Sequence, residues 1–197
     1  MKELIVTGFE PFGGETINPS WEAVKLLPDI VNGYRLIKLE LPTVYGKAAE
    51  KIFNAAKDTD LFGVLSVGQA GGRRCVTPEM SAINLRYSRI PDNSGRMCFD
   101  EPVAEGGENS YFSTLPVRKI EAALKDEGIE SAVSYSAGTF VCNDVMYSVL
   151  HHFRDTDVKC GFIHIPYIPE QGHLDQPSMP LEKIVRALVT AISVITA

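Results

Sequence analysis

Cysteine and concentrated positive charge are scarce in this sequence. Its 197 residues include only four cysteines, which lie far apart and form no Cys-x-x-Cys pair. Nothing therefore indicates a zinc site, and the simplest expectation is no metal and four free thiols, of which at most one has a chemical role. The 19 Lys and Arg residues are outnumbered by 25 Asp and Glu residues and form no basic run, which argues against a nucleic-acid partner.

Long apolar segments are also missing. The apolar run near the N-terminus is too short for the core of a signal peptide and leads directly into a Gly- and Pro-rich segment. The C-terminal stretch 181–197 is interrupted by Glu182, Lys183 and Arg186, a pattern that suits an amphipathic helix docked on a core. We expect no membrane association and no export.

What is present is the pattern of a globular α/β protein. Hydrophobic residues make up 45% of the chain and charged residues 22%, and its length suits one domain, residues 1–197. Strands are expected at 4–6, 34–41, 62–67, 132–135 and 161–165, with an extended piece at 75–87. Helices are expected at 18–27, 45–56, 117–124, 143–153 and 181–197. This alternation predicts a three-layer α/β/α sandwich with a mostly parallel, mixed and twisted sheet.

One segment, 88–113, does not fit that alternation. It is rich in Gly, Pro, Asn, Asp and Glu, and we interpret it as a long excursion that serves as a lid or as an arm for oligomer contacts. Its Cys98 is expected to be an exposed thiol or to lie at an interface.

Polar residues follow three of the expected strands. They are Gly68 and Gln69, the segment 138–142, and His164 at the end of its strand. Ligands in open α/β sheets bind outside the carboxyl ends of the strands. We therefore expect a functional site where these three pieces meet.

Cys142 is the candidate nucleophile. It lies in the segment SAGTFVCNDVM, where Gly138 permits a tight turn and Asn143 begins the expected helix. A thiol at a helix N-terminus feels the positive end of the helix dipole, which predicts a lowered pKa and a thiolate. Backbone N–H groups in the same turn are suited to hold an oxyanion. The alternative is a buried structural cysteine.

His164 is the candidate base for Cys142. Strand alternation places its side chain on the same face as Phe162. His151 and His152 lie on the helix that follows Cys142, about 13 Å further along its axis, which is too far for a hydrogen bond. A hydrogen-bonded histidine at a sheet edge, without a catalytic role, is the alternative.

A carboxylate is needed to orient the histidine, and the residues alone leave three candidates. They are Glu79, Asp92 and Asp144. A carboxylate that hydrogen-bonds imidazole selects its tautomer and stabilises the imidazolium. Nothing in their local sequence separates the three.

Two glycine-rich segments raise the question of nucleotide binding. The segment 68–72 lacks the GxGxxG spacing, and no Gly-Lys-Ser/Thr sequence of a phosphate loop is present. The segment 8–14 carries Phe9 and Phe12 in a Gly/Pro loop, where large aromatic residues are unusual because loops run on the surface. An aromatic slot for a small, flat, uncharged group is one interpretation, and ordinary anchoring of the loop is the other.

At these segments the sequence resembles the pyroglutamyl-peptidase I (pyrrolidone-carboxylate peptidase) family of cysteine peptidases. The similar pieces, in the order of the family, are TGFEPFGGETINPSWEAV, VGQAGGR, the stretch from Glu79 to Asn93, SAGTFVCNDVMY and GFIHIPYIPEQ. They extend over nearly the whole chain. Several blocks together are far more specific than any one of them.

The resemblance implies an exopeptidase that removes an N-terminal pyroglutamyl residue from peptides without a metal or other cofactor. It implies that Cys142 is the nucleophile, His164 the base and Glu79 the third member of the triad, in preference to Asp92. It further implies cytoplasmic location and a homodimer or homotetramer. The substrate-binding residues that it implies are Phe9, Phe12, Asn18, Gln69, Arg89, Phe140, Val141 and Met146.

Two other functions are compatible with parts of the pattern. A nucleoside-phosphorylase-like α/β enzyme would need a phosphate site, for which Arg73, Arg74 and Arg89 are the candidates. A binding module without catalysis would use the Phe9 and Phe12 slot for pyroglutamyl N-termini. Phosphate-dependent release of a nucleobase, or binding without turnover, would distinguish these.

Overall fold

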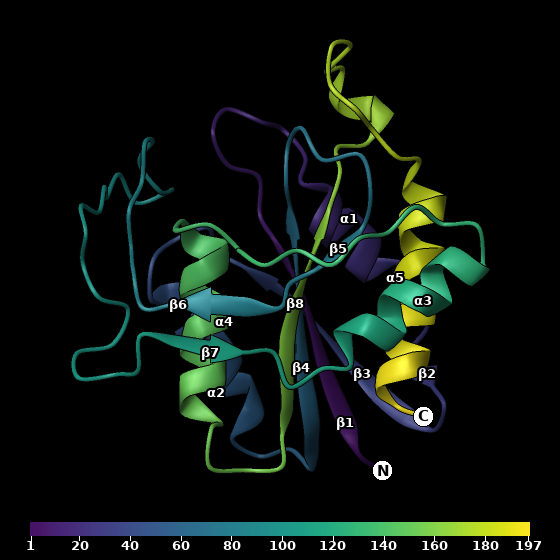
Figure 1. The fold of residues 1–197 in the computed structure, drawn as a ribbon, viewed down its shortest axis with the longest axis horizontal. Coiled ribbons are helices and arrows are strands. Elements are labelled where there is room, and N and C mark those ends of the chain that lie inside the picture. The colour runs from purple at the N-terminus through teal and green to yellow at the C-terminus, as the bar shows by residue number, and fades with distance from the viewer.

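A six-stranded sheet forms the centre of the computed structural model, which describes residues 1–197 (Figure 1). Its strand order is β2-β3-β1-β4-β8-β5. The strands are β1 (Glu3–Phe9), β2 (Ile30–Val31), β3 (Tyr34–Leu41), β4 (Leu61–Gln69), β5 (Thr77–Pro78) and β8 (Lys159–Ile165). The four central strands are parallel, whereas the edge strands β2 and β5 are antiparallel to their neighbours. The predicted mixed, mostly parallel sheet is confirmed.

Helices cover both faces of this sheet. Helices α1 (Pro19–Lys25), α3 (Val117–Asp126) and α5 (Leu181–Ile195) lie on one side, and α2 (Lys47–Ala56) and α4 (Val141–His152) on the other (Figure 1). Each side has its own apolar cluster, of 24 and 18 buried residues respectively. The three-layer α/β/α sandwich is therefore confirmed. None of the helices combines the length and apolar character that crossing a bilayer requires.

The burial of the central strands explains their sequences. All seven residues of β1 and six of seven in β8 are buried, as expected for parallel strands covered on both faces. In β8, Ile163 and Ile165 face the α1/α3/α5 cluster and Phe162 faces the α2/α4 cluster. His164 shares the face of Phe162, as alternation predicts, and their ring centroids are 4.6 Å apart.

The expected strand at 132–135 was wrong. The stretch 131–134 makes only two isolated bridges to the stretch around β5, Val76 with Ser131 and Glu79 with Ser134. Pro78 lies between them and has no N–H to donate, so a continuous ladder cannot form. The start of α4 also differs: the helix begins at Val141 rather than 143, so Cys142 is part of its first turn.

The excursion leaves the body of the protein beyond α4 (Figure 1). It begins after β6 (Ser81–Ile83) and returns through β7 (Ser110–Phe112), which pairs with β6 in a separate antiparallel sheet. Cys98 is fully buried in the α2/α4 cluster, which corrects the expectation of an exposed thiol. Its backbone N–H donates to Ser88 Oγ at 3.0 Å, so the two sides of the excursion are joined at this point.

Candidate active site

Cys142 lies in the first turn of α4, at the edge of the sheet where the parallel strands end. Gly138 makes the turn before the helix, with φ of +80°, a conformation that favours glycine. The backbone N–H groups of Val141, Cys142 and Asn143 donate to no protein acceptor. Since Cys142 itself is only half-buried, these N–H groups and the thiol are available to the same bound group.

Cys142 and His164 lie on the same face of the sheet, near Gly68. Gly68 in β4 is the direct partner of His164 in β8, and paired residues of adjacent parallel strands point to the same face. A Cβ atom placed on Gly68 would lie 3.0 Å from Cys142 Sγ. The sulfur therefore sits over the strand next to the one that carries the imidazole, on the same face of the sheet.

A carboxylate holds the imidazole from the opposite side. His164 Nδ1 lies 2.7 Å from Glu79 Oε1, and both side chains are buried. An ionised carboxylate can only accept, so Nδ1 carries the proton and Nε2 is left as the acceptor. This is the tautomer that a base for a nearby thiol needs.

The two other candidate carboxylates are engaged elsewhere. Asp144 pairs with Arg86 at 2.6 Å and accepts from the backbone N–H of Gly46 at 2.8 Å. Asp92 accepts hydrogen bonds within its own loop and from the backbone N–H of Tyr45. Of the three, only Glu79 contacts His164.

The remaining histidines also have other partners. His151 shares a hydrogen bond with Tyr111, His152 stacks on Phe53, and His173 pairs with Glu15. In addition, no three His, Cys, Asp or Glu side chains are grouped closely enough to hold a metal ion.

The environment favours a charged Glu79 and a neutral His164. Burial by itself raises the pKa of Glu79, but the hydrogen bond and charge of His164, followed by smaller effects of Ser134 and of the Arg73 guanidinium, outweigh it and leave the pKa below its usual value. Burial lowers the pKa of His164, and the opposing effect of Glu79 is the smaller one. The pair therefore rests as carboxylate and neutral imidazole near neutral pH.

The predicted lowering of the Cys142 pKa was wrong. Burial, with the negative charge of Glu79 as the second cause, raises the pKa of this thiol to about 12. Arg73 and the backbone N–H act in the opposite direction but are weaker. The start of a helix does favour a thiolate, but here desolvation decides, because few protein atoms replace the water that an anion loses. Cys142 rests as a thiol.

The predicted substrate-binding residues divide into two groups. Phe9, Val141 and Met146 are fully buried parts of the α2/α4 cluster. Phe12 and Phe140 are half-buried in loops that flank Cys142, and their ring centroids are 6.0 Å apart. An apolar surface of two aromatic rings thus lies beside the thiol, above a packed core.

The polar residues predicted for binding have different environments. Asn18 is buried: its Oδ1 caps α1, and its Nδ2 donates to the Glu10 carbonyl at 3.0 Å, which anchors the loop that carries Phe12. Gln69 is half-buried, and its Oε1 accepts from Gln171 Nε2 at 2.8 Å. Arg89 is exposed.

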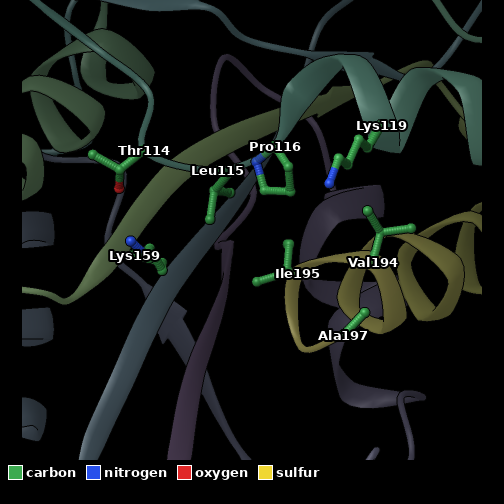
Figure 2. A pocket seen from close by; sticks show the side chains of 8 residues that line it. All are labelled: Thr114, Leu115, Pro116, Lys119, Lys159, Val194, Ile195 and Ala197. Carbon is green, nitrogen blue, oxygen red and sulfur yellow. The ribbon is translucent and has the colours of Figure 1, made fainter.

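A cavity of about 360 Å³ adjoins the loop before Cys142. Arg89 and Phe140 line it together with Tyr87, Ser88, Ile90 and Thr139. A separate cavity of about 500 Å³, between α3, α5 and the start of β8, includes Lys119, Lys159 and Val194 (Figure 2). It lies at the amino end of β8. Cys142 and His164 lie at the opposite side of the sheet, where the parallel strands have their carboxyl ends.

Two residues have roles at the site that the sequence analysis did not assign. Gly68 leaves the space that Cys142 Sγ and the Phe162 ring occupy, since an added Cβ would lie 2.7 Å from Phe162 Cζ. Arg73 contacts Glu79, although its sequence pattern indicated only a candidate phosphate ligand. Both roles depend on contacts between different elements, which no local pattern records.

Two solved structures that share this fold are peptidases. The chain is similar to pyroglutamyl peptidase I from Bacillus amyloliquefaciens, with a TM-score of 0.94 and 43% identity over 100% of this chain and 97% of that one. It is also similar to a mutant pyrrolidone carboxyl peptidase from Pyrococcus furiosus, with a TM-score of 0.93 and 40% identity over 98% of this chain and 97% of that one. The protein is therefore an enzyme of the peptidase class.

Sequence relatives narrow this class further. A pyrrolidone-carboxylate peptidase from Lactobacillus johnsonii is 48% identical over 198 residues, which cover 98% of this chain and 92% of that one. Another from Staphylococcus carnosus is 46% identical and covers 98% and 93%. Residues 2–197 match the pyroglutamyl peptidase family. The chain belongs to the pyroglutamyl peptidase family.

Proposed function

We propose that this protein is a cysteine exopeptidase that hydrolyses the bond after an N-terminal pyroglutamyl residue, with Cys142 as nucleophile, His164 as base and Glu79 as the orienting carboxylate. The observation that carries the proposal is the 2.7 Å contact between Glu79 and His164 Nδ1, together with a thiol held over the neighbouring strand. The names of the relatives supply the substrate class.

Attack begins from a neutral thiol. As Cys142 Sγ forms a bond to the scissile carbonyl carbon, its proton passes to His164 Nε2, and Glu79 stabilises the imidazolium that forms. The carbonyl oxygen becomes an oxyanion, for which the free N–H groups of Val141 and Cys142 are suitable donors. Since the raised pKa of Cys142 disfavours a free thiolate, proton transfer and attack are coupled.

Two further steps complete the cycle. The imidazolium returns its proton to the leaving amine, the C–N bond breaks, and the pyroglutamyl group remains on Cys142 as a thioester. Water then attacks the thioester with His164 as base, which releases pyroglutamate and restores the thiol. No oxidant, reductant or cofactor enters this balance.

A neutral lactam suits the residues beside the thiol. Pyroglutamate has no free amine, so the site needs no carboxylate for an ammonium group. Phe12 and Phe140 offer apolar surface to the ring, and Gln69 offers an amide to the lactam. A buried site with such polar groups discriminates against proline, which has no lactam oxygen, because a polar group of the protein would stay unpaired.

The test compares three proteins on two substrates. Wild-type protein is expected to release the fluorescent amine from a pyroglutamyl amide but not from the matching prolyl amide. Cys142→Ala is expected to lose at least about 10⁴-fold in kcat with an unchanged circular dichroism spectrum. Cys75→Ala is the matched control, because Cys75 is also a half-buried free thiol and has no place in the mechanism. Full activity of Cys142→Ala would refute the proposal.

We also propose that the excursion contributes to a homodimer or homotetramer in the cytoplasm. Exposed apolar side chains gather on it and on β7, among them Ile90, Met97, Phe99 and Phe112. Apolar groups of this size on a surface are typical of contacts between proteins. Light scattering after size exclusion measures the mass, and Phe99→Ser is expected to shift it toward the monomer. A monomeric wild-type protein would contradict this assignment.

The alternative of a phosphorylase-like site has less support. It would need Arg73 as a phosphate ligand, but this guanidinium is already paired with Glu79. Arg74 and Arg89 are exposed on separate loops and do not form a common anion site.

A further inference from the structure

We propose that Arg73 is a positioning residue of this active site: its guanidinium holds the Glu79 carboxylate against His164 and ties it to the loop that leads into α4, the helix that carries Cys142. The inference rests on the proposed function, because it assigns a role in the same reaction. It concerns a residue for which the sequence suggested only a phosphate ligand.

The first support is the set of contacts that Arg73 makes. Its Nη1 lies 2.6 Å from Glu79 Oε1 and 2.5 Å from Thr77 Oγ1, and its Nη2 donates to the Ser136 carbonyl at 3.3 Å. The Thr77 hydroxyl in turn donates to the His164 carbonyl at 3.3 Å. One guanidinium therefore joins β5, the carboxylate and the loop before α4.

The second support is the position of Glu79. Its side chain is fully buried, its Oε2 has no hydrogen-bond partner, and its Oε1 accepts from both Arg73 and His164. A neutral imidazole donates a hydrogen bond but brings no charge. Arg73 is thus the one permanent positive charge in contact with this buried carboxylate, and it favours the ionised form that accepts from His164.

The third support is the effect on the charge states of the reaction. The charged groups that act on His164 are Glu79 and Arg73, and the same two groups act on Cys142. The positive charge of Arg73 lowers the pKa of both His164 and Cys142, although in each case burial is the largest influence. Removal of Arg73 should therefore make His164 protonate at higher pH and make the Cys142 thiol harder to ionise.

The experiment uses three variants of the full chain with a pyroglutamyl amide as substrate. Arg73→Met removes the charge and keeps an apolar stem of similar length. Arg73→Lys keeps the charge but not the planar group that reaches two acceptors at once. Arg74→Met is the matched control, because Arg74 is the neighbouring residue, is exposed and forms no ion pair. Unfolding temperature, kcat, KM and the pH profile of kcat/KM are measured for each.

Arg73→Met is expected to lower kcat about 10- to 100-fold and to change KM less than about threefold, because a small displacement of reacting groups is enough for such a loss. The acid limb of its kcat/KM profile should move to higher pH. Arg73→Lys should return the acid limb to the wild-type pH and should have a kcat between those of wild type and Arg73→Met. Arg74→Met should match wild type in kcat and in the position of the acid limb. A purely structural role would lower the unfolding temperature without moving the limb.

Three results would overturn the proposal: an Arg73→Met protein with kcat within about twofold of wild type, an unmoved acid limb, or a limb that moves equally in Arg74→Met. The alkylation rate of Cys142 by iodoacetamide supplies the same comparison without substrate, and it should fall in Arg73→Met alone. An inactive wild-type protein would refute the proposed function, whereas an active wild type with unchanged alkylation in Arg73→Met would refute only the role of Arg73.

Discussion

Glu79 and Asp144 are two buried carboxylates that have the same kind of partner and different surroundings. Each has a fully buried side chain, and each lies 2.6 Å from an arginine nitrogen. Asp144 uses both oxygens, one for Arg86 and the other for the backbone N–H of Gly46. Glu79 uses one oxygen for two donors and leaves the other without a partner.

This difference indicates what each pair does. Asp144 joins the first turn of α4 to the start of α2 and to Arg86 at the root of the excursion, so its bonds hold elements together. One carboxylate oxygen of Glu79 lacks a hydrogen-bond partner, and the stability of its ionised form depends on the charge of the imidazole beside it. A buried carboxylate with hydrogen bonds to both oxygens stabilises the structure. A buried carboxylate with one unpaired oxygen, such as Glu79, responds to the protonation of its neighbour.

The largest expected effect comes from removing the charge of Glu79. Glu79→Gln should lower kcat roughly 10²- to 10⁴-fold, because an amide can donate to Nδ1 and so favour the wrong tautomer of His164. Steady-state hydrolysis of a pyroglutamyl amide measures it. If Asp144→Ala, compared at equal amounts of folded protein, lost as much kcat as Glu79→Gln, the distinction between the two carboxylates would not hold.

Asp144→Ala should instead reduce stability. The change leaves Arg86, whose side chain is only 15% exposed, without its charged partner, and loss of one member of a buried pair costs about 3–5 kcal/mol. Urea unfolding gives the free energy. Glu79→Gln should cost less than this, since Arg73 is more exposed than Arg86 and keeps Thr77 and the Ser136 carbonyl as partners. The reverse order of stabilities would contradict the comparison.

The site around Glu79 and His164 also requires that residue 68 has no side chain. We expect no such steric requirement around Asp144. Gly68→Ala should lower kcat about 10- to 100-fold, because its Cβ would lie within 3.0 Å of the Phe162 ring and of Cys142 Sγ and would displace the thiol. Gly63→Ala is the control: it lies in the same strand and is equally crowded, but by the Lys159 carbonyl. Equal losses of kcat in the two variants would mean that strand distortion alone is responsible.

The last prediction changes no residue and concerns the charge of the thiol beside Glu79. With a pKa raised to about 12, Cys142 is ionised to a greater extent at each higher pH, so its alkylation by iodoacetamide should accelerate about tenfold per pH unit from pH 7 to 10. Mass spectrometry of the labelled peptide measures this rate. A rate that levels off below pH 8 would indicate a stable thiolate, and the effect of the helix terminus would then exceed that of burial and Glu79.

Local patterns were sufficient for most of the secondary structure. The strand at Tyr34–Leu41 has the bounds that alternation predicted, and the cap of Asn18 on α1 follows from the residue types. The strand expected at 132–135 failed because the pairing partner contains Pro78, which lies in another part of the chain. Cys98 was expected to be exposed because the segment 88–113 is rich in Gly, Pro, Asn, Asp and Glu, but it belongs to the buried cluster formed with residues of α2 and α4 that are distant in sequence.

The sequence alone determined the order of strands and helices along the chain, and the positions of Cys142 after a turn and of His164 at a strand end, because periodicity and spacing are local properties. The family was indicated by the resemblance of several sequence blocks. The resemblance already implied Glu79, but three features were decided only by the tertiary structure: the contact of Glu79 with His164, the engagement of Arg73 and the charge of the thiol. Each depends on distances between segments and on the exclusion of water. Desolvation acts through everything that surrounds a group, so the residues adjacent to Cys142 in the chain could not indicate that burial outweighs the helix dipole.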